Sequence, residues 1–94
     1  MATFIFLGKY TSDAMKGMSA KRTAEATDLI KKLGGTVVSM YALIGQNDLL
    51  LIVNLHGIQE ALKASVVLHK TTGILFTTSP AISVEEFDTL TASI

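Results

Sequence analysis

The chain has 94 residues and a mass of 10.0 kDa, which predicts one domain spanning residues 1–94. Eight Lys and Arg residues balance eight Asp and Glu residues, and this zero net charge argues against a nucleic-acid-binding module. Hydrophobic residues make up 49% of the chain and charged residues only 17%, which excludes intrinsic disorder. Because so few charges are available to cover a small domain, we expect part of its surface to be hidden in an oligomer.

The sequence contains no cysteine, so disulfides, thiolate metal sites and cysteine nucleophiles are excluded. The longest apolar run, Leu49–Val53, is far shorter than the roughly 20 residues that span a bilayer. The apolar start, Thr3–Leu7, is too short for the core of a signal peptide. We therefore expect a cytoplasmic protein that does not bind membranes.

The first half of the chain predicts a strand, a loop and a helix. The strand covers Ala2–Leu7, which is rich in aromatic and β-branched residues, and the loop covers Lys9–Met18. Ser19 is a good N-cap for the helix, and Gly34–Gly35 is a strong signal for its end. The expected inner face of this helix consists of Ala20, Ala24, Thr27, Ile30 and Leu33.

The second half predicts a hairpin, a long helix, a strand and a short terminal helix. These elements are Thr36–Ile44, the tight connection Gly45–Asp48, Leu49–Leu55, Ile58–Thr72, Ile74–Ser79 and Val84–Leu90. Gly73 ends the long helix, and Pro80 is expected to stop the last strand. One line of the long helix carries Ile58, Leu62, Ser65 or Val66, and His69.

The order of these elements, β-α-β-β-α-β, predicts an α+β, ferredoxin-like fold: a four-stranded antiparallel sheet with two helices on one face. In a sheet with one solvent-exposed face, each strand alternates apolar and polar residues. No such alternation occurs in Phe4–Leu7, Leu49–Val53 or Ile74–Phe76. Both faces are therefore expected to be buried, whereas the two helices cover only one. A second copy packed sheet against sheet, as in a dimeric α/β barrel, is the economical explanation.

Five residues are candidates for a ligand site, namely Tyr10, Arg22, Tyr41, Gly45 and Asp48. Arg22 is the sole arginine and lies one turn into the first helix, where it suits a carboxylate or phosphate. The alternative is a solvated basic face. Asp48 either closes the turn by accepting backbone hydrogen bonds or places a carboxylate at the rim of a pocket near the Gly45–Asp48 connection. Tyr10 opens the long loop, and Tyr41 lies mid-strand, where its phenol faces an interface or a cavity.

His56 and His69 are the only histidines, and neither has a second ligand at a metal-binding spacing. We interpret both as partly exposed side chains, with a haem or metal ligand role for His69 as the alternative. The sequence shows no phosphate-binding loop, nucleophile elbow or zinc spacing. We accordingly expect no cofactor and no metal, and the catalytic residues, if any, stay unassigned.

Four segments of the chain form a recognisable set: Leu7–Thr11, Lys32–Gly35, Tyr41–Asp48 and Glu85–Phe87. Together they resemble the GYD domain family of small bacterial and archaeal proteins. The resemblance implies a ferredoxin-like, dimeric α/β barrel. In the Gly-Tyr-Asp signature that names the family, this chain has Asn47 where the tyrosine usually stands and retains Asp48.

The glycine–aspartate hairpin is also similar to that of the ligand-binding regulatory domains of Lrp/AsnC transcription factors, which bind amino acids between subunits. From both resemblances we predict a homodimer or higher homo-oligomer that binds a small anionic or zwitterionic molecule at the dimer interface. Asp48 would take an amino group, and Arg22 or backbone N–H groups would take a carboxylate. The alternatives are a cofactor-independent oxygenase or isomerase that uses His69 or Tyr41, and a purely structural assembly protein.

Overall fold

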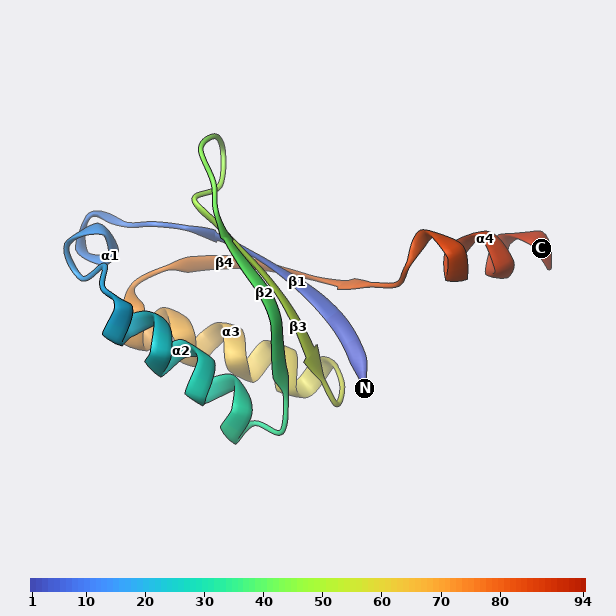
Figure 1. The fold of residues 1–94 in the computed structure, drawn as a ribbon, viewed down its shortest axis with the longest axis horizontal. Helices are drawn as coiled ribbons and strands as arrows, with labels where there is room; N and C mark the ends of the chain where they lie inside the picture. Colours follow the sequence, from blue (N-terminus) through green and yellow to red (C-terminus); the bar gives the residue numbers. More distant parts are fainter.

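The computed structural model describes residues 1–94 and contains four strands and four helices (Figure 1). In chain order the elements are β1 (Ala2–Lys9), α1 (Ser12–Lys16), α2 (Ala20–Lys32), β2 (Thr36–Ala42), β3 (Leu49–Leu55), α3 (Ile58–Thr72), β4 (Leu75–Ala81) and α4 (Val84–Ala92). No helix is long and apolar enough to cross a membrane.

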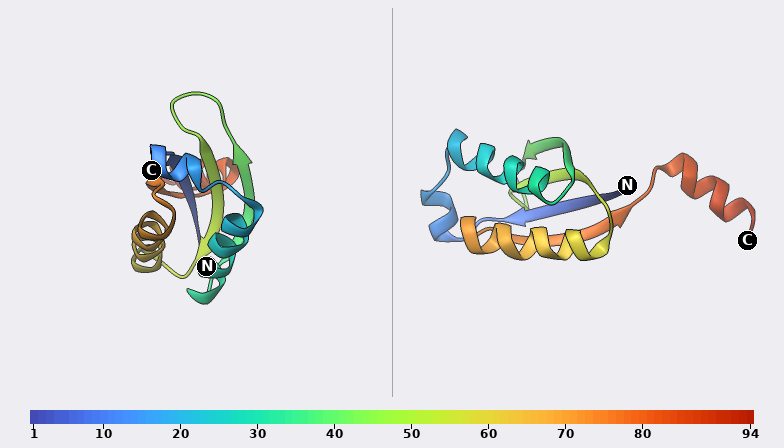
Figure 2. Two further views of the ribbon diagram at one scale, coloured as in Figure 1. Left: turned by 90° about the vertical axis from the view of Figure 1, so that its left-hand side faces the viewer. Right: turned by 90° about the horizontal axis from the view of Figure 1, so that it is seen from below.

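The strands form one antiparallel sheet in the order β2-β3-β1-β4, with β1 and β3 in the centre. Helices α2 and α3 lie on the same face of this sheet (Figures 1 and 2). The predicted ferredoxin-like fold is confirmed. Because β1 begins the chain and pairs with both β3 and β4, it brings the end of the first strand beside the β2–β3 hairpin and the end of α3.

The two central strands have apolar residues on both faces of the sheet. The inner face, under the helices, carries the fully buried residues Phe4, Phe6, Leu51, Val53 and Leu55. The outer face carries Ile5, Leu7, Leu50 and Ile52, which are only partly buried. The pairing register places Ile5 opposite Ile52 and Leu7 opposite Leu50, so these four side chains form one apolar patch. Within one chain nothing covers this patch, and the predicted sheet-to-sheet dimer stays a prediction.

Two expectations about the first helical region are wrong. Residues 9–18 are not a plain loop but contain α1, in which the Thr11 hydroxyl accepts from Ala14 N at 3.1 Å and Ala14 is fully buried. A five-residue helix is too short to show helical periodicity in the sequence. Of the expected inner face of α2, Ile30 is fully buried and Leu33 packs against the core, but Ala20 and Ala24 are exposed, and Ala26 and Leu29 pack there instead. The large side chains of Leu29, Ile30 and Leu33 set the buried face because they remove more apolar area from water than alanine does.

Two strand ends also differ from the prediction. β2 stops at Ala42, and the connection to β3 is a longer loop in which Ile44 is fully exposed. β4 continues through Pro80, which was expected to stop it. Proline is tolerated in β4 because it is an edge strand, where alternate N–H groups point away from the sheet and form no ladder hydrogen bond.

Two helices expose apolar side chains. On α3, Ala61, Ala64 and Leu68 pack on the sheet, so the line of Ile58, Leu62 and Val66 faces solvent. Helix α4 has no buried residue at all and extends away from the sheet beyond the end of β4 (Figure 1). The single chain therefore leaves one face of its sheet and one whole helix without packing partners.

Candidate functional site

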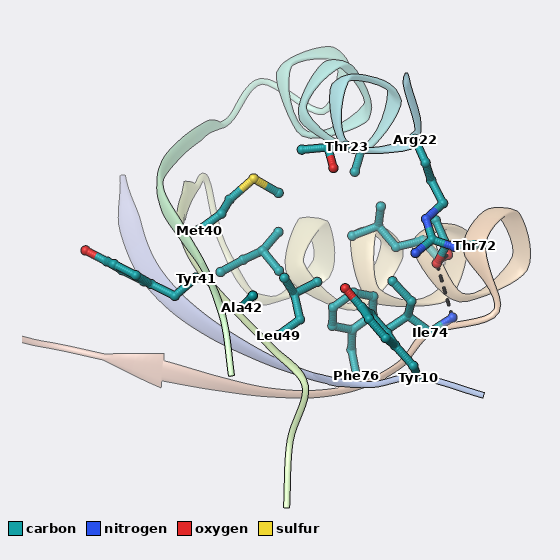
Figure 3. Close-up of a pocket in the computed structure, with 13 residues that line it drawn as sticks. Tyr10, Arg22, Thr23, Met40, Tyr41, Ala42, Leu49, Thr72, Ile74 and Phe76 are labelled. Atoms are coloured by element: carbon teal, nitrogen blue, oxygen red, sulfur yellow. Dashed lines mark hydrogen bonds between the residues drawn. The ribbon is translucent and has the colours of Figure 1, made fainter. Parts of the chain in front are cut away.

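A cavity of about 220 Å³ lies between the sheet and the helices α2 and α3 (Figure 3). Ten of its 13 lining residues are hydrophobic. The full lining consists of Tyr10, Arg22, Thr23, Ala26, Met40, Tyr41, Ala42, Leu49, Leu51, Leu68, Thr72, Ile74 and Phe76. Arg22 is the single charged residue among them, so the cavity combines apolar walls with one fixed positive charge.

Arg22 is held at the cavity by its helix and by two contacts of its guanidinium. The N-cap Ser19 fixes the first turn of α2 by accepting from Arg22 N at 3.1 Å. The guanidinium Nη1 donates to the carbonyl oxygen of Ala14, and Cζ lies 5.7 Å from the centroid of the Tyr10 ring. Neither partner carries a negative charge. The guanidinium has five N–H donors, so most of them are available to an anionic group.

Asp48 does not line the cavity, but its carboxylate bonds to the backbone of Tyr10, which does. Its carboxylate Oδ2 accepts from Tyr10 N at 2.8 Å, and its own backbone N donates to the Gly8 carbonyl oxygen at 2.8 Å. Asp48 also accepts from Leu43 N at 2.8 Å through its carbonyl oxygen. These bonds join the β2–β3 hairpin to the end of β1. Tyr10, which lines the cavity, directly follows β1. The carboxylate thus accepts a backbone hydrogen bond, but its donor is Tyr10, 38 residues away, and not a residue of the turn itself.

The other two candidates, Tyr41 and Gly45, place no side chain inside the cavity. Tyr41 borders the cavity, but its ring is directed away from the other lining side chains and is 55% exposed (Figure 3). The register pairs Tyr41 with Leu50, so its phenol lies on the outer face of the sheet. Gly45 sits at the hairpin tip with φ +148°, and a Cβ placed there would meet nothing within 4 Å. The structure therefore brings Tyr10 and Arg22 together, whereas Gly45 and Asp48 are not among the lining residues.

Neither histidine lies in the cavity. His69 is exposed near the end of α3, where its Nδ1 lies 3.0 Å from the carbonyl oxygen of Ile74. A carbonyl accepts only, so this contact requires the tautomer with hydrogen on Nδ1. His56 is exposed and packs beside Gly34. Both positions agree with the interpretation of partly exposed side chains.

Most of the cavity wall was not singled out from the sequence. Met40, Leu68 and Phe76 come from β2, α3 and β4, Ile74 lies between α3 and β4, and all four look like ordinary core residues. Thr72 is another missed residue: its hydroxyl donates to Leu68 O at 2.6 Å. The same hydroxyl accepts from Ile74 N at 3.1 Å (Figure 3). No local motif marks these positions, because the cavity exists only once helix, strand and hairpin are assembled.

The model of the GYD domain matches residues 4–91, which is nearly the whole chain. The chain belongs to the GYD domain family. Among solved structures, this GYD domain is similar to the leucine response regulatory protein (LrpA) of Mycobacterium tuberculosis, with a TM-score of 0.58 and 8% sequence identity. The alignment covers 87% of the GYD chain and 51% of LrpA, so the chain spans about half the length of that regulator. A comparison with curated protein sequences gives no match.

The family resemblance predicted from the sequence is confirmed. At 8% identity the likeness to LrpA shows a shared fold, and fold alone does not fix function. The function of this GYD protein therefore depends on the chemistry of its own cavity and surface.

Proposed function

We propose that this GYD protein is a small-molecule-binding module whose ligand has an apolar body and a single carboxylate. The observation that carries the proposal is the cavity itself, with ten hydrophobic lining residues and Arg22 as the one charged group. Pockets that bind small molecules are concave and mostly apolar, with a few polar groups that fix orientation. At about 220 Å³ the cavity is smaller than the ~300–1,000 Å³ of drug-sized sites, which favours a small ligand.

A carboxylate is the chemical group that best fits Arg22. The planar guanidinium matches a carboxylate with two parallel N–H···O bonds, and such charge-assisted pairs are about twice as strong as neutral hydrogen bonds. The contact with the Tyr10 ring and the bond to the Ala14 carbonyl hold the guanidinium in one orientation before a ligand arrives. The apolar tail would then lie against Leu68, Ile74 and their neighbours.

The same cavity disfavours a zwitterionic ligand such as an amino acid. No acidic residue lines it, and the carboxylate expected to take the amino group, that of Asp48, accepts from Tyr10 N instead. An ammonium group in an apolar cavity without a carboxylate partner bears a desolvation penalty that no ion pair offsets. Of the two ligand classes predicted from the sequence, the proposal keeps the anionic one.

Calorimetric titration with three matched probes tests this proposal. Hexanoate, norleucine and hexylamine share a six-carbon chain and differ only in their charged groups. We expect hexanoate to bind, and norleucine and hexylamine to bind at least tenfold more weakly. Arg22→Gln keeps a donor but removes the charge, so it is expected to weaken hexanoate binding about 10- to 100-fold.

Lys21→Gln is the matched control, because it removes the neighbouring charge from a residue that does not line the cavity. Its effect is expected to be below threefold. Equal binding of all three probes, or equal losses in the two variants, would show that the cavity does not recognise a carboxylate through Arg22.

The protein is further proposed to be a homo-oligomer that assembles through the outer face of its sheet. The partly buried patch of Ile5, Leu7, Leu50 and Ile52 supports this, because a soluble domain rarely leaves the centre of a sheet face uncovered. The same patch favours a second candidate function, that of a structural assembly unit, if the cavity proves to bind nothing.

Catalysis by His69 or Tyr41 gains no support, since the His69 ring bonds to the Ile74 carbonyl and the Tyr41 ring leaves the cavity. The cytoplasmic location and the absence of nucleic-acid partners stay predictions.

A further inference from the structure

We infer that α4 is an exchanged arm, which packs its apolar stripe on the outer sheet surface of a second copy of this chain. The inference rests on the proposed homo-oligomer and adds the element that completes its interface. The stripe consists of Val84, Phe87 and Leu90, which recur every three residues and so lie on one side of the helix. Their side chains are 75%, 53% and 55% exposed in the single chain.

The stripe marks α4 as a helix built to be buried. Its first turn is fixed by Ser83, whose hydroxyl accepts from Glu86 N at 3.0 Å, so the helix begins at a defined residue. A nine-residue helix is marginal in water on its own, and helices of this length gain most of their stability from packing an apolar face. Within its own chain α4 has no buried residue, because β4 directs it away from the sheet (Figures 1 and 2).

The charge distribution favours packing of α4 against the remainder of a second chain over packing against the α4 helix of that chain. Glu85, Glu86 and Asp88 give α4 three of the eight acidic residues, and none of the eight Lys and Arg residues lies in it. The helix therefore carries a charge of −3 and the rest of the chain +3. Two α4 helices packed side by side would repel each other, whereas the remainder of a second chain carries a net charge of the opposite sign.

The area of the interface requires more than the sheet. Four strands of about seven residues make a face of about 440 Å². Each partner in a standard stable interface buries about 800 Å². An α4 helix of nine residues covers roughly 130 Å², and in a two-fold dimer each chain both donates and receives one helix. Because the received helix covers part of the sheet face already counted, exchange of the arms adds only the donated helix and brings the contact to about 570 Å² per chain, nearer to what a stable dimer needs.

Light scattering over a dilution series of the full-length chain tests the inference, with circular dichroism as the check on folding. Phe87→Asp/Leu90→Asp places two charges on the stripe, at positions exposed in the single chain and so harmless to its fold. We expect wild type to be a dimer. We expect the dissociation constant of the dimer to be at least about 100-fold higher for the double variant. Thr89→Asp/Ala92→Asp adds the same charges to the opposite side of α4 and is expected to stay dimeric.

Other occupants of the stripe give different outcomes. If α4 folds back on its own sheet, disrupting the stripe would uncover that sheet and strengthen association, which would overturn the inference. Leu62→Asp instead places a charge on the exposed apolar line of α3. If this variant dissociates and the sheet variant Ile52→Asp stays dimeric, the subunits contact each other through α3, which would overturn the inference. A dimer that survives Phe87→Asp/Leu90→Asp refutes the arm alone, whereas a monomeric wild type refutes the proposed oligomer as well.

Discussion

Replacement of Asp48 by Ala is expected to destabilise the fold, because its carboxylate ties the β2–β3 hairpin to the start of the cavity wall. Oδ2 accepts from Tyr10 N at 2.8 Å, and the substitution leaves this part-buried N–H without its acceptor. Hydrogen bonds to charged groups contribute about 1.5–3 kcal/mol, and the partial exposure of this site places the loss near the middle of that range, at about 2 kcal/mol. For a domain of this size such a loss lowers Tm by roughly 8–16 °C.

Urea unfolding followed by circular dichroism measures this loss, at equal protein concentrations because oligomerisation makes stability concentration-dependent. Asp48→Asn keeps an amide oxygen as acceptor but not the charge, so it is expected to lose about half as much. Asn47→Ala is the control, since it changes the adjacent side chain and leaves the bond to Tyr10 intact. If Asp48→Ala unfolds within about 0.5 kcal/mol of wild type, the role assigned to this carboxylate is refuted.

The same substitution is expected to weaken hexanoate binding. The Tyr10 ring lies 5.7 Å from the Arg22 guanidinium, so a shift of the Tyr10 backbone disturbs the group that holds the carboxylate. The effect on affinity is therefore indirect, and Asp48→Asn should restore most of it. Calorimetry on the folded fraction separates this loss of affinity from the loss of stability.

Two further substitutions have expected outcomes. Gly35→Ala would place a Cβ 2.5 Å from the carbonyl oxygen of Asn54, which forces the backbone to shift and costs about 1–3 kcal/mol in urea unfolding. Gly57→Ala meets only a side-chain atom at 3.5 Å and should cost far less; equal losses would contradict the steric argument. Ile52→Asp is expected to give monomers in light scattering. Gln59→Asp, at an exposed position of α3, is expected to stay dimeric. A dimeric Ile52→Asp variant would exclude the sheet interface.

Much of the fold was predictable because local signals and global topology agree. The strand Leu49–Leu55 and the helix Ile58–Thr72 have the predicted bounds, and Gly73 ends that helix with φ +77°, a conformation that favours glycine. The inner face of α2 was wrong because alanines carry little information about which side is buried. Ala20 and Ala24 fit helical spacing as well as Ala26 does, and only the position of the sheet decides between them.

The site was predictable only in part. Arg22 could be singled out as the sole arginine near a helix start, but its contact with Tyr10 depends on how α1 turns the chain. The partner of Asp48 lies 38 residues away, so no local pattern identifies it. The placement of Tyr41 depends on strand register, since a shift of one residue would move its ring to the other face of the sheet.

Chemical-shift mapping of the ¹⁵N-labelled protein with hexanoate reports where the ligand binds. If Arg22 recognises the carboxylate, we expect shifts at Tyr10, Arg22 and the cavity-lining residues Leu68 and Ile74, all lost in Arg22→Gln. Shifts confined to the loop 43–48, or to the outer face of the sheet, would place the ligand outside this cavity and refute the proposed binding site.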